Sequence, residues 1–540
     1  MVSAMRGRCL LTIGLMAAPL AAPAADCAVL SKITTPPATT IVSAKLESSG
    51  SFQPPTGAPL DKLPEFCRVA GVLKPSDDSH IEFEVWMPAT GWNGKFQGIG
   101  NGGFAGSISY AGLADAIRNG YAAASTDTGH KGGGTDAGWA LGHPEKIVDF
   151  GHRAIHEMTV KGKAIVESFY GSSPRRSYFS SCSNGGRQAL MEAQRYPEDY
   201  DGIIAGAPAN YWSHLLLNAV SLMQATAGTP ASYIPSSKLP AIQAAALAAC
   251  DASDGVKDGV IENPARCRFD PAALLCGSTG GTESSQCLTA GQVKALRQAY
   301  DGLRSSKGAL LFPGYSPGGE ADNGGWGPWI TGQAPEKSLM FAFGTGYFRN
   351  MVYSNAAWDY KSFNLADDAR NAEKPGLILN STNPDLKRFE ARRGKLILYH
   401  GWCDAAIPAQ NAIDYYESVV KKMGRGTAER FVRLYMVPGM QHCGGGAGPN
   451  VFGQAGVARS DARQNISAAL ERWVEAGLAP AEIIAARYKT PGVVERTRPL
   501  CPFPQVARYK GSGDTNDAAN FECGAQAAGA ASPPAGRVAN

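Results

Sequence analysis

The chain has 540 residues, of which 44% are hydrophobic and 18% charged, a composition typical of one large or two ordinary globular domains. Its formal net charge of +4 is small and dispersed along the chain, which argues against a nucleic-acid partner.

Residues 1–24 have the pattern of a secretory signal peptide. Arg6 and Arg8 precede the apolar run 9–20, and the small residues 22–24 suit cleavage after Ala24. The run is too short to cross a bilayer, and no other apolar stretch reaches membrane-spanning length. We therefore expect a secreted or periplasmic protein without a membrane partner, in a compartment that favours disulfides over metal thiolates.

Strand and helix patterns alternate from residue 25 to about residue 210. Strands are predicted at 81–87, 95–99 and 121–126. An amphipathic helix over 152–169 leads to a further strand at 176–179. This alternation predicts an α/β fold with a mainly parallel sheet and helices on both faces.

A serine follows the last of these strands, in a turn of small residues. The sequence Ser181-Cys182-Ser183-Asn184-Gly185 lies between the strand and a helical pattern over 188–196. This is the layout of the nucleophile elbow of α/β-hydrolases, whose usual motif is Gly-x-Ser-x-Gly. Here Ser181 replaces the first glycine and Gly185 supplies the second. The alternative interpretation is a Ser/Gly-rich surface turn.

Residues 211–382 interrupt the alternation, with many Gly, Pro and Trp and few clear strands. We predict a lid domain inserted into a catalytic domain that comprises residues 25–210 and 383–523. The alternative is a separate appended domain. The tail, residues 524–540, is rich in Ala, Gly and Pro and is expected to be disordered.

Within the insertion, Asp251, Asp254 and Asp258 are interleaved with glycines in a short loop. Carboxylates and turn-forming glycines in this arrangement are typical of a calcium loop, although the spacing and the last position differ from an EF-hand. The alternative is an Asp/Gly turn without a cation.

Two further candidates follow strand patterns in the last third of the chain. Asp404 comes after the buried pattern 395–400, and His442 lies on a glycine-rich loop after the pattern 431–437. In α/β-hydrolases the triad follows the chain order serine, acid, histidine. The order predicts Ser183 as nucleophile, Asp404 as acid and His442 as base. Taken singly, Asp404 also fits a turn or helix cap, and most of the eight histidines are expected to be structural.

Together these residues resemble the tannase and feruloyl esterase family of secreted α/β-hydrolases. The resemblance rests on Cys182-Ser183, Asp404 and His442-Cys443, since this family joins the neighbours of its catalytic serine and histidine by a disulfide. It extends from about residue 27 to residue 523, with further matching stretches at 399–402, 437–440, 498–502 and 507–513.

The resemblance implies five disulfides, a connectivity that spacing alone does not select. The implied pairs are Cys27 with Cys67, Cys182 with Cys443, Cys250 with Cys267, Cys276 with Cys287, and Cys501 with Cys523. Cys403 is left over beside Asp404, and we interpret it as a small buried packing residue rather than a redox group. With the cysteines paired and the histidines scattered, no zinc site is expected.

The resemblance also implies an oxyanion hole and a structural Ca²⁺ site. The backbone N–H groups of Asn184 and Gly103 would bind the oxyanion, although the glycines near Gly103 also suit a simple tight turn. The calcium ligands would be three side chains and two carbonyls: Asp251, Asp254 and Asp258, with Val256 and Val260.

In this family lid aromatics line the pocket for an aromatic acyl group, which implies that role for Trp329, Phe341 and Phe343. Aromatic clusters are otherwise typical of a core. Relatives that hydrolyse mono(2-hydroxyethyl) terephthalate hold its free carboxylate with a lid arginine, and Leu339 stands at that position here. This departure disfavours terephthalate esters.

We therefore predict a secreted serine carboxylesterase that hydrolyses small esters of aromatic acids through an acyl-enzyme. Feruloyl and other hydroxycinnamoyl esters come first, with galloyl esters, as in a tannase, or mono(2-hydroxyethyl) terephthalate as alternatives. A serine peptidase on the same fold is a rival enzyme, and a calcium-loaded binding protein is the rival without catalysis. The triad residues disfavour the binding protein, while acyl specificity, alcohol specificity and oligomeric state stay open.

Overall fold

The computed structural model describes residues 26–33, 38–277, 284–454 and 461–525. The predicted signal peptide and residues 526–540 of the predicted tail lie outside the described residues. Gly524, which we assigned to the tail, instead ends a strand, because it pairs with Val506 across a hairpin. Among the described residues, no helix combines the length and apolarity needed to span a membrane.

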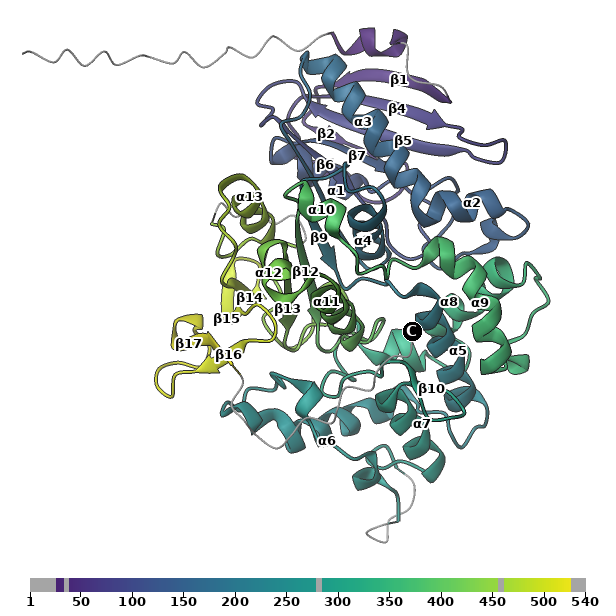
Figure 1. Cartoon of the computed structure of the whole chain (residues 1–540). Helices are drawn as coiled ribbons and strands as arrows, with labels where there is room; N and C mark the ends of the chain where they lie inside the picture. Colours follow the sequence, from purple (N-terminus) through teal and green to yellow (C-terminus); the bar gives the residue numbers. More distant parts are fainter. Residues whose placement is uncertain (1–25, 34–37, 278–283, 455–460, 526–540) are drawn as a thin grey trace, which may run out of the picture.

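A nine-stranded sheet forms the centre of the molecule (Figure 1). Its strands, in spatial order, are β1 (Thr39–Glu47), β4 (Phe66–Leu73), β5 (Ile81–Pro88), β7 (Ala122–Thr126), β6 (Lys95–Ile99), β8 (Arg176–Cys182), β9 (Gly202–Gly206), β12 (Lys395–Gly401) and β13 (Val432–Val437). Pairing is parallel from β7 to β13 and antiparallel from β1 to β7. The sheet is thus mainly parallel, as predicted.

Both faces of the sheet are covered, which explains why its central strands are apolar throughout. In β12, Leu396 and Leu398 enter one hydrophobic core, whereas Ile397 and Tyr399 enter another on the opposite face. The first core includes α3 (Ala154–Tyr170), α4 (Asn184–Arg195) and α11 (Gln410–Met423). The second includes α1 (Tyr110–Arg118) and α13 (Ile466–Ala476). The remaining helices of this part are α2 (Pro144–Val148), α10 (Lys387–Ala391) and α12 (Arg425–Phe431).

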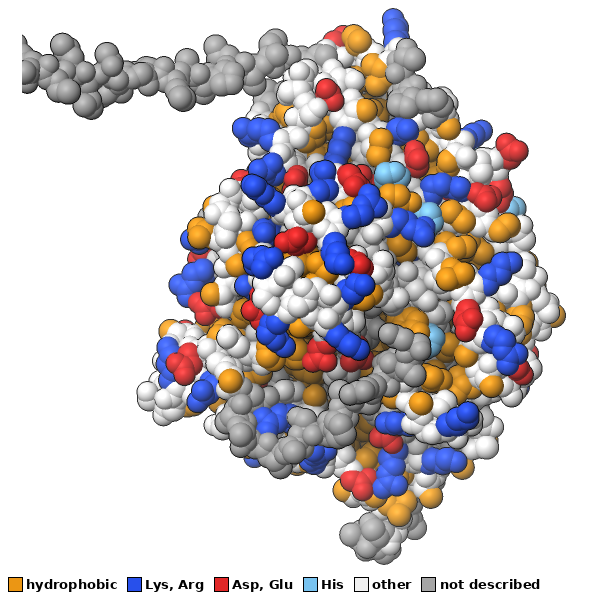
Figure 2. Space-filling view, viewed as in Figure 1, with side chains coloured by type: hydrophobic (Ala, Val, Ile, Leu, Met, Phe, Trp, Pro, Cys, Tyr) orange, Lys and Arg blue, Asp and Glu red, His pale blue; other side chains and the backbone are white. Residues whose placement is uncertain are grey.

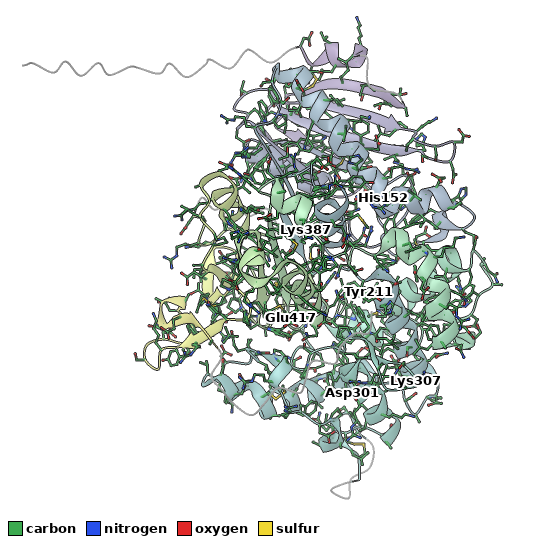
Figure 3. The ribbon with its side chains drawn as sticks, in the orientation of Figure 1. His152, Tyr211, Asp301, Lys307, Lys387 and Glu417 are labelled. Atoms are coloured by element: carbon green, nitrogen blue, oxygen red, sulfur yellow. A yellow bond between two sulfur atoms is a disulfide. The ribbon has the colours of Figure 1, made fainter. Side chains whose placement is uncertain are left out.

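Residues 211–382 form a largely helical region beside the sheet, drawn in teal and green in Figure 1. Its helices are α5 (Trp212–Ala227), α6 (Leu239–Cys250), α7 (Ala290–Asp301), α8 (Leu339–Tyr347) and α9 (Leu365–Leu379). Tyr211, the first residue of this region, and Lys387, which follows its end, are labelled in Figure 3. A third hydrophobic core joins it to Phe104 and to residues 405–407 of the sheet domain. The inserted region therefore packs directly on loops at the carboxyl ends of the strands.

Four two-stranded hairpins complete the fold. They are β2 (Ser51–Phe52) with β3 (Leu60–Asp61), β10 (Leu303–Arg304) with β11 (Leu310–Phe312), β14 (Ile483–Thr490) with β15 (Val493–Leu500), and β16 (Val506–Tyr509) with β17 (Phe521–Gly524). On the face shown in Figure 2, Lys and Arg side chains are interspersed with Asp and Glu. This mixture agrees with the dispersed charge of the sequence.

Candidate active site

Ser183 occupies a sharp turn between β8 and α4. Its backbone has φ 69° and ψ −126°, a conformation that costs a non-glycine residue energy and that α/β-hydrolases use to expose a nucleophile. The helix begins at Asn184, four residues before the helical pattern we recognised at 188, because the small residues of the elbow weaken that pattern. Ser183 N–H donates to the carbonyl of Gly206 at 2.9 Å, which ties the turn to β9.

The serine at the first position of the elbow motif is accommodated by glycines around it. A Cβ atom added to Gly185 would lie 1.9 Å from Ser181 Oγ, and one added to Gly100 would lie 2.8 Å from the same atom. Neither position has room for a larger residue. Ser181 therefore replaces the usual glycine without displacing the turn.

The structure brings the three predicted triad residues into hydrogen-bonding order. His442 Nε2 lies 2.9 Å from Ser183 Oγ, and His442 Nδ1 lies 2.8 Å from Asp404 Oδ2. Asp404 follows β12 and His442 follows β13, so the two side chains come from loops at the carboxyl ends of neighbouring parallel strands. This is the geometry in which a histidine accepts a proton from serine while a carboxylate fixes its ring.

Partners other than His442 also stabilise the ionised form of Asp404. Its Oδ1 accepts the backbone N–H groups of Ala406 and Ile407, both at 2.8 Å. Its Oδ2 also lies 3.1 Å from Nε2 of the fully buried His400. Burial opposes ionisation of Asp404, but the charge and hydrogen bonds of His442 and His400 outweigh it and lower the pKa of the carboxyl well below its usual value.

His400 is a site residue that our sequence reasoning missed. It was recognised as the end of a buried strand and as part of the family-matching stretch 399–402, without a role of its own. Its Nε2 is shared between Asp404 and the carbonyl of Ile407, at 3.0 Å from the latter. The available signals were its place in the family-matching stretch 399–402 and its spacing of four residues from Asp404.

A disulfide joins the neighbours of the nucleophile and the histidine. Cys182 and Cys443 are bonded, with Cα atoms 6.0 Å apart. The other four disulfides also join the pairs that the family resemblance implied. Cys403 is a free, buried thiol, and burial raises its pKa, which fits a packing role.

The two predicted oxyanion donors lie on segments that hydrogen bonds hold together. Asn184 opens α4, where backbone N–H groups lack intrahelical acceptors. The loop that carries Gly103 is fastened to the same helix, because Asn101 N–H donates to Gln188 Oε1 at 2.9 Å. Gly103 has φ 56°, and a Cβ there would lie 2.2 Å from the carbonyl oxygen of Gly134. Only glycine therefore fits this position.

The Arg187 side chain stabilises the first turn of α4. Its guanidinium is fully buried, donates from Nε to Asn184 Oδ1 at 2.7 Å, and bonds the carbonyls of Phe150 and Gly151. Burial lowers its pKa to about 9. No sequence pattern indicated this role, since an arginine in a helix is ordinarily exposed.

Of the three predicted pocket aromatics, Trp329 lies against the triad and Phe343 lies against Trp329. The ring of Trp329 meets His442 edge to face, with centroids 5.2 Å apart, and stacks on Phe343 at 6.0 Å. Phe343 also contacts Phe104, at 5.3 Å. Phe341 instead packs edge to face on Tyr360. Trp329, next to His442, and Phe343, stacked on Trp329, thus form an aromatic wall on one side of His442.

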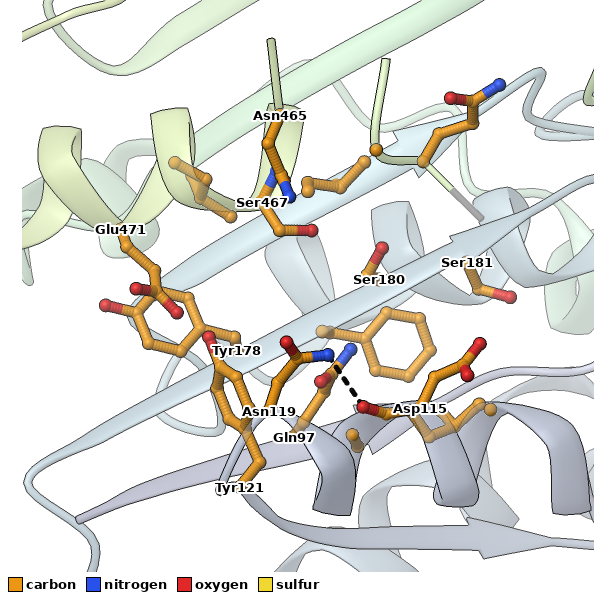
Figure 4. A pocket seen from close by; sticks show the side chains of 18 of the residues that line it. Gln97, Asp115, Asn119, Tyr121, Tyr178, Ser180, Ser181, Asn465, Ser467 and Glu471 are labelled. Atoms are coloured by element: carbon orange, nitrogen blue, oxygen red, sulfur yellow. Dashed lines mark hydrogen bonds between the residues drawn. The ribbon is translucent and has the colours of Figure 1, made fainter. Parts of the chain in front are cut away.

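A cavity of about 520 Å³ lies next to β8, the strand that leads to Ser183 (Figure 4). Its lining includes Ser180 and Ser181 of β8, together with Asp115, Asn119 and Glu471. Neither Ser183 nor His442 lines it. The cavity is therefore separate from the triad, although both touch the same strand.

The predicted calcium loop is folded by its own carboxylates. Asp251 accepts the backbone N–H groups of residues 258 and 259, and Asp254 and Asp258 each accept the N–H two residues further on. Asp258 Oδ2 also pairs with Arg498 at 2.7 Å and Arg496 at 3.1 Å. A disulfide from Cys250 to Cys267 closes the loop.

The donor chemistry of this loop fits Ca²⁺, which takes carboxylate and carbonyl oxygens. Burial, and then the nearby charge of Asp258, raise the pKa of Asp254, so a cation would relieve an unfavourable charge there. The ligand atoms of the three described carboxylates do not all lie within 4.8 Å of one another. Binding would have to draw them together.

Comparison with known proteins gives a consistent result. A family model described as "Tannase and feruloyl esterase" matches residues 67–524. An uncharacterized esterase of Xanthomonas campestris pv. campestris is 43% identical over 517 residues, which cover 90% of this chain and 89% of the relative. A probable feruloyl esterase B-1 of Aspergillus fumigatus is 33% identical, over 85% of this chain and 86% of its own length.

Solved structures resemble the whole fold. Feruloyl esterase B from Aspergillus oryzae has a TM-score of 0.86 at 30% identity, over 92% of this chain and 99% of its own. Tannin acyl hydrolase from Aspergillus niger has a TM-score of 0.73 at 25% identity, over 92% of this chain and 94% of its own. Together with the nine-stranded sheet, these similarities establish an α/β-hydrolase fold.

Proposed function

The chain belongs to the tannase and feruloyl esterase family of carboxylic ester hydrolases, and on that basis we propose that it is a secreted serine esterase acting on esters of aromatic acids. The observation that carries the proposal is the chain of contacts from Asp404 through His442 to Ser183.

In the proposed reaction, Ser183 Oγ attacks the ester carbonyl while its proton passes to Nε2 of His442. The imidazolium then protonates the leaving alcohol, and the acid remains bound to Ser183 as an acyl-enzyme. Water, deprotonated by the same nitrogen, attacks the acyl group and releases the free acid. Asp404 holds the ring through Nδ1 and stabilises its charged form.

The oxyanion of each tetrahedral intermediate would be bound by the backbone N–H groups of Asn184 and Gly103. The positive end of α4 supports the first of these donors. Arg187 supports it indirectly, because it holds the Asn184 side chain at the start of the helix.

We propose an aromatic acyl group because aromatic rings stand where that group would lie. Trp329 and Phe343 offer flat apolar surfaces next to His442, and residues 211–382 act as the lid that carries them. Feruloyl esters are placed first because the structure of feruloyl esterase B has a higher TM-score to this chain than that of tannin acyl hydrolase. Galloyl esters are the second candidate.

A structural Ca²⁺ is proposed for the loop 251–260. The side chains of Asp251, Asp254 and Asp258 and the carbonyls of Val256 and Val260 would hold it. Its contribution would be to stabilise the loop and hence the lid, with no part in the chemical step. Chelation should lower the melting temperature, and the D254N variant should be insensitive to both chelator and added Ca²⁺.

The proposal is tested with Ser183→Ala and a panel of methyl ferulate, methyl gallate, p-nitrophenyl acetate and a peptide substrate. Loss of the nucleophile should lower kcat by roughly 10⁶-fold while circular dichroism and melting temperature stay unchanged. Undiminished ester hydrolysis by S183A would refute the assignment, and faster turnover of the peptide than of any ester would favour the peptidase rival. Secretion is checked by finding the mature chain, cleaved after Ala24, outside the cytoplasm.

A further inference from the structure

A second cluster of ligand-type side chains lies at the far end of the nucleophile helix. His156 on α3, Glu192 on α4 and Asp199 in the turn before β9 place one ligand atom each so that all three lie within 4.8 Å of one another. It is the one such group of three His, Cys or acidic residues among the described residues. Glu192 lies nine residues after Ser183, a helical rise of roughly 13 Å, so this cluster is separate from the triad.

Glu192 is the unusual member. Its side chain is 1% exposed, and neither carboxylate oxygen has a hydrogen-bond donor among the described residues. Burying an unpaired carboxylate costs several kcal/mol, so a positive species must stand beside it. Either a proton or a metal cation can meet this requirement.

The geometry around His156 favours a cation that takes nitrogen as well as oxygen. His156 Nδ1 lies 2.7 Å from Asp199 Oδ2, so this nitrogen points into the cluster. The imidazole stacks on Tyr196, with centroids 3.9 Å apart and planes at 7°, which fixes its orientation. Tyr196 is held in turn by His152, labelled in Figure 3, through a 2.8 Å hydrogen bond. His156 is 29% exposed, so the cluster opens to solvent on this side.

Lys163 does not supply the positive charge that the Glu192 carboxylate needs. Lys163 Nζ donates to the backbone carbonyl of Asp199 and lies 5.4 Å from the centre of the Tyr200 ring. No ion pair between Lys163 and either carboxylate is present in the described part of the chain.

We propose that His156, Glu192 and Asp199 form a binding site for a divalent transition-metal cation of the Zn²⁺ class. One imidazole nitrogen with two carboxylate oxygens suits Zn²⁺ better than Ca²⁺ or Mg²⁺, which prefer oxygen alone. The two carboxylates balance its charge. On binding, the proton between His156 and Asp199, and any proton on Glu192, pass to solvent.

The cation would fasten α3, the end of α4 and the turn before β9 to one another. These three segments also meet through apolar packing on one face of the sheet and through hydrogen bonds such as those from His152 to Tyr196 and from Lys163 to the carbonyl of Asp199. The site therefore adds stability to the helix whose first residue follows the nucleophile, and it takes no part in ester hydrolysis. The scattered positions of the histidines pointed away from zinc, because residues 156, 192 and 199 form no recognisable spacing motif.

The test uses the full mature chain, freed of metal with a chelator and then saturated with Ca²⁺ so that the loop 251–260 cannot take up the probe. Zn²⁺ is titrated calorimetrically, and melting temperature is recorded with and without Zn²⁺. The variants are His156→Gln and Glu192→Gln. His143→Gln is the matched control, because His143 pairs with Asp78 at the same kind of distance, 2.8 Å, on the surface without a third ligand.

We expect one Zn²⁺ to bind the wild type and H143Q, with a rise in melting temperature. Affinity should fall at least roughly 10-fold in H156Q and E192Q, and the thermal shift should vanish in both. Equal Zn²⁺ affinity in wild type and H156Q would overturn the proposal. The proposal would also be overturned if Zn²⁺ left the melting temperature of the wild type unchanged and E192Q were more stable than the wild type. That result would assign a shared proton to the carboxyl groups of Glu192 and Asp199.

Discussion

Ser183 Oγ and His442 Nε2 lie 2.9 Å apart although 259 positions separate them in the chain. The residues beside them, Cys182 and Cys443, are linked covalently. The distance between these two side chains is thus set partly by a bond and partly by the central sheet, in which β9 and β12 lie between β8 and β13.

Reduction of this disulfide should impair catalysis before it unfolds the protein. The bond closes a loop with a separation of 261 residues, for which chain entropy predicts a stabilisation of about 5 kcal/mol. Its positional effect acts on kcat, because a hydrogen bond from Ser183 to His442 must form in each turnover. We expect a Cys182→Ala/Cys443→Ala double variant to lose most of its kcat at a temperature where circular dichroism still reports a native fold. Full activity in that folded variant would contradict the idea.

His400 should act as a positioning residue for Asp404. In His400→Leu the carboxylate loses a donor, a change worth about 1.5–3 kcal/mol, which corresponds to roughly 10–100-fold in kcat. KM should change little, because His400 is buried away from substrate. His400→Gln keeps a donor and should recover part of the loss. Equal kcat values in the leucine and glutamine variants, after correction for folded fraction, would count against this role.

Trp329 should determine preference for aromatic acyl groups. Removing its ring in Trp329→Ala takes away apolar contact worth about 1.5–3 kcal/mol, so kcat/KM for methyl ferulate should fall roughly 10–100-fold. Hydrolysis of p-nitrophenyl acetate should fall much less. Phe341→Leu is the comparison, since Phe341 contacts Tyr360 in this structure. A larger loss in F341L than in W329A would place the acyl pocket on the other side of α8.

Asp414 should make stability depend on pH. Burial raises its pKa to about 6 from an ordinary 3.8, so the folded state holds the proton more tightly than the unfolded state. Its contribution is fully present below about pH 4 and is lost as the pH rises through about 6, to a total of at most about 3 kcal/mol. Urea unfolding at pH 4.5 and 7.5 should therefore show a larger drop for wild type than for Asp414→Asn. An equal drop would remove Asp414 as the cause.

The triad could be predicted because each of its members stands at a strand end in a fixed chain order. Glycines marked the elbow, and a strand pattern preceded both Asp404 and His442. The central strands were predictable for a related reason, since burial on both faces leaves them apolar throughout. These are local signals that a single sequence carries.

The residues that the sequence did not identify depend on contacts between distant segments. Arg187 and Glu192 lie on the same helix and look like ordinary polar positions, yet both are fully enclosed by other parts of the chain. Phe341 and Phe343 are two positions apart and look equivalent, but a helix turns them toward different neighbours. Only the folded arrangement distinguishes such residues.

The hydrophobic core shared by residues 211–382 and residues 405–407 limits how this enzyme can be redesigned. The backbone that holds Asp404 Oδ1 is part of that core, so the inserted region and the catalytic acid are mechanically coupled. In a chimera that carries the whole insertion of a relative, the inserted residues would no longer match residues 405–407, which hold Asp404. Trp329 and Phe343 pack against the same core, so exchanges in the aromatic wall should conserve side-chain volume if they are to leave the position of Asp404 unchanged.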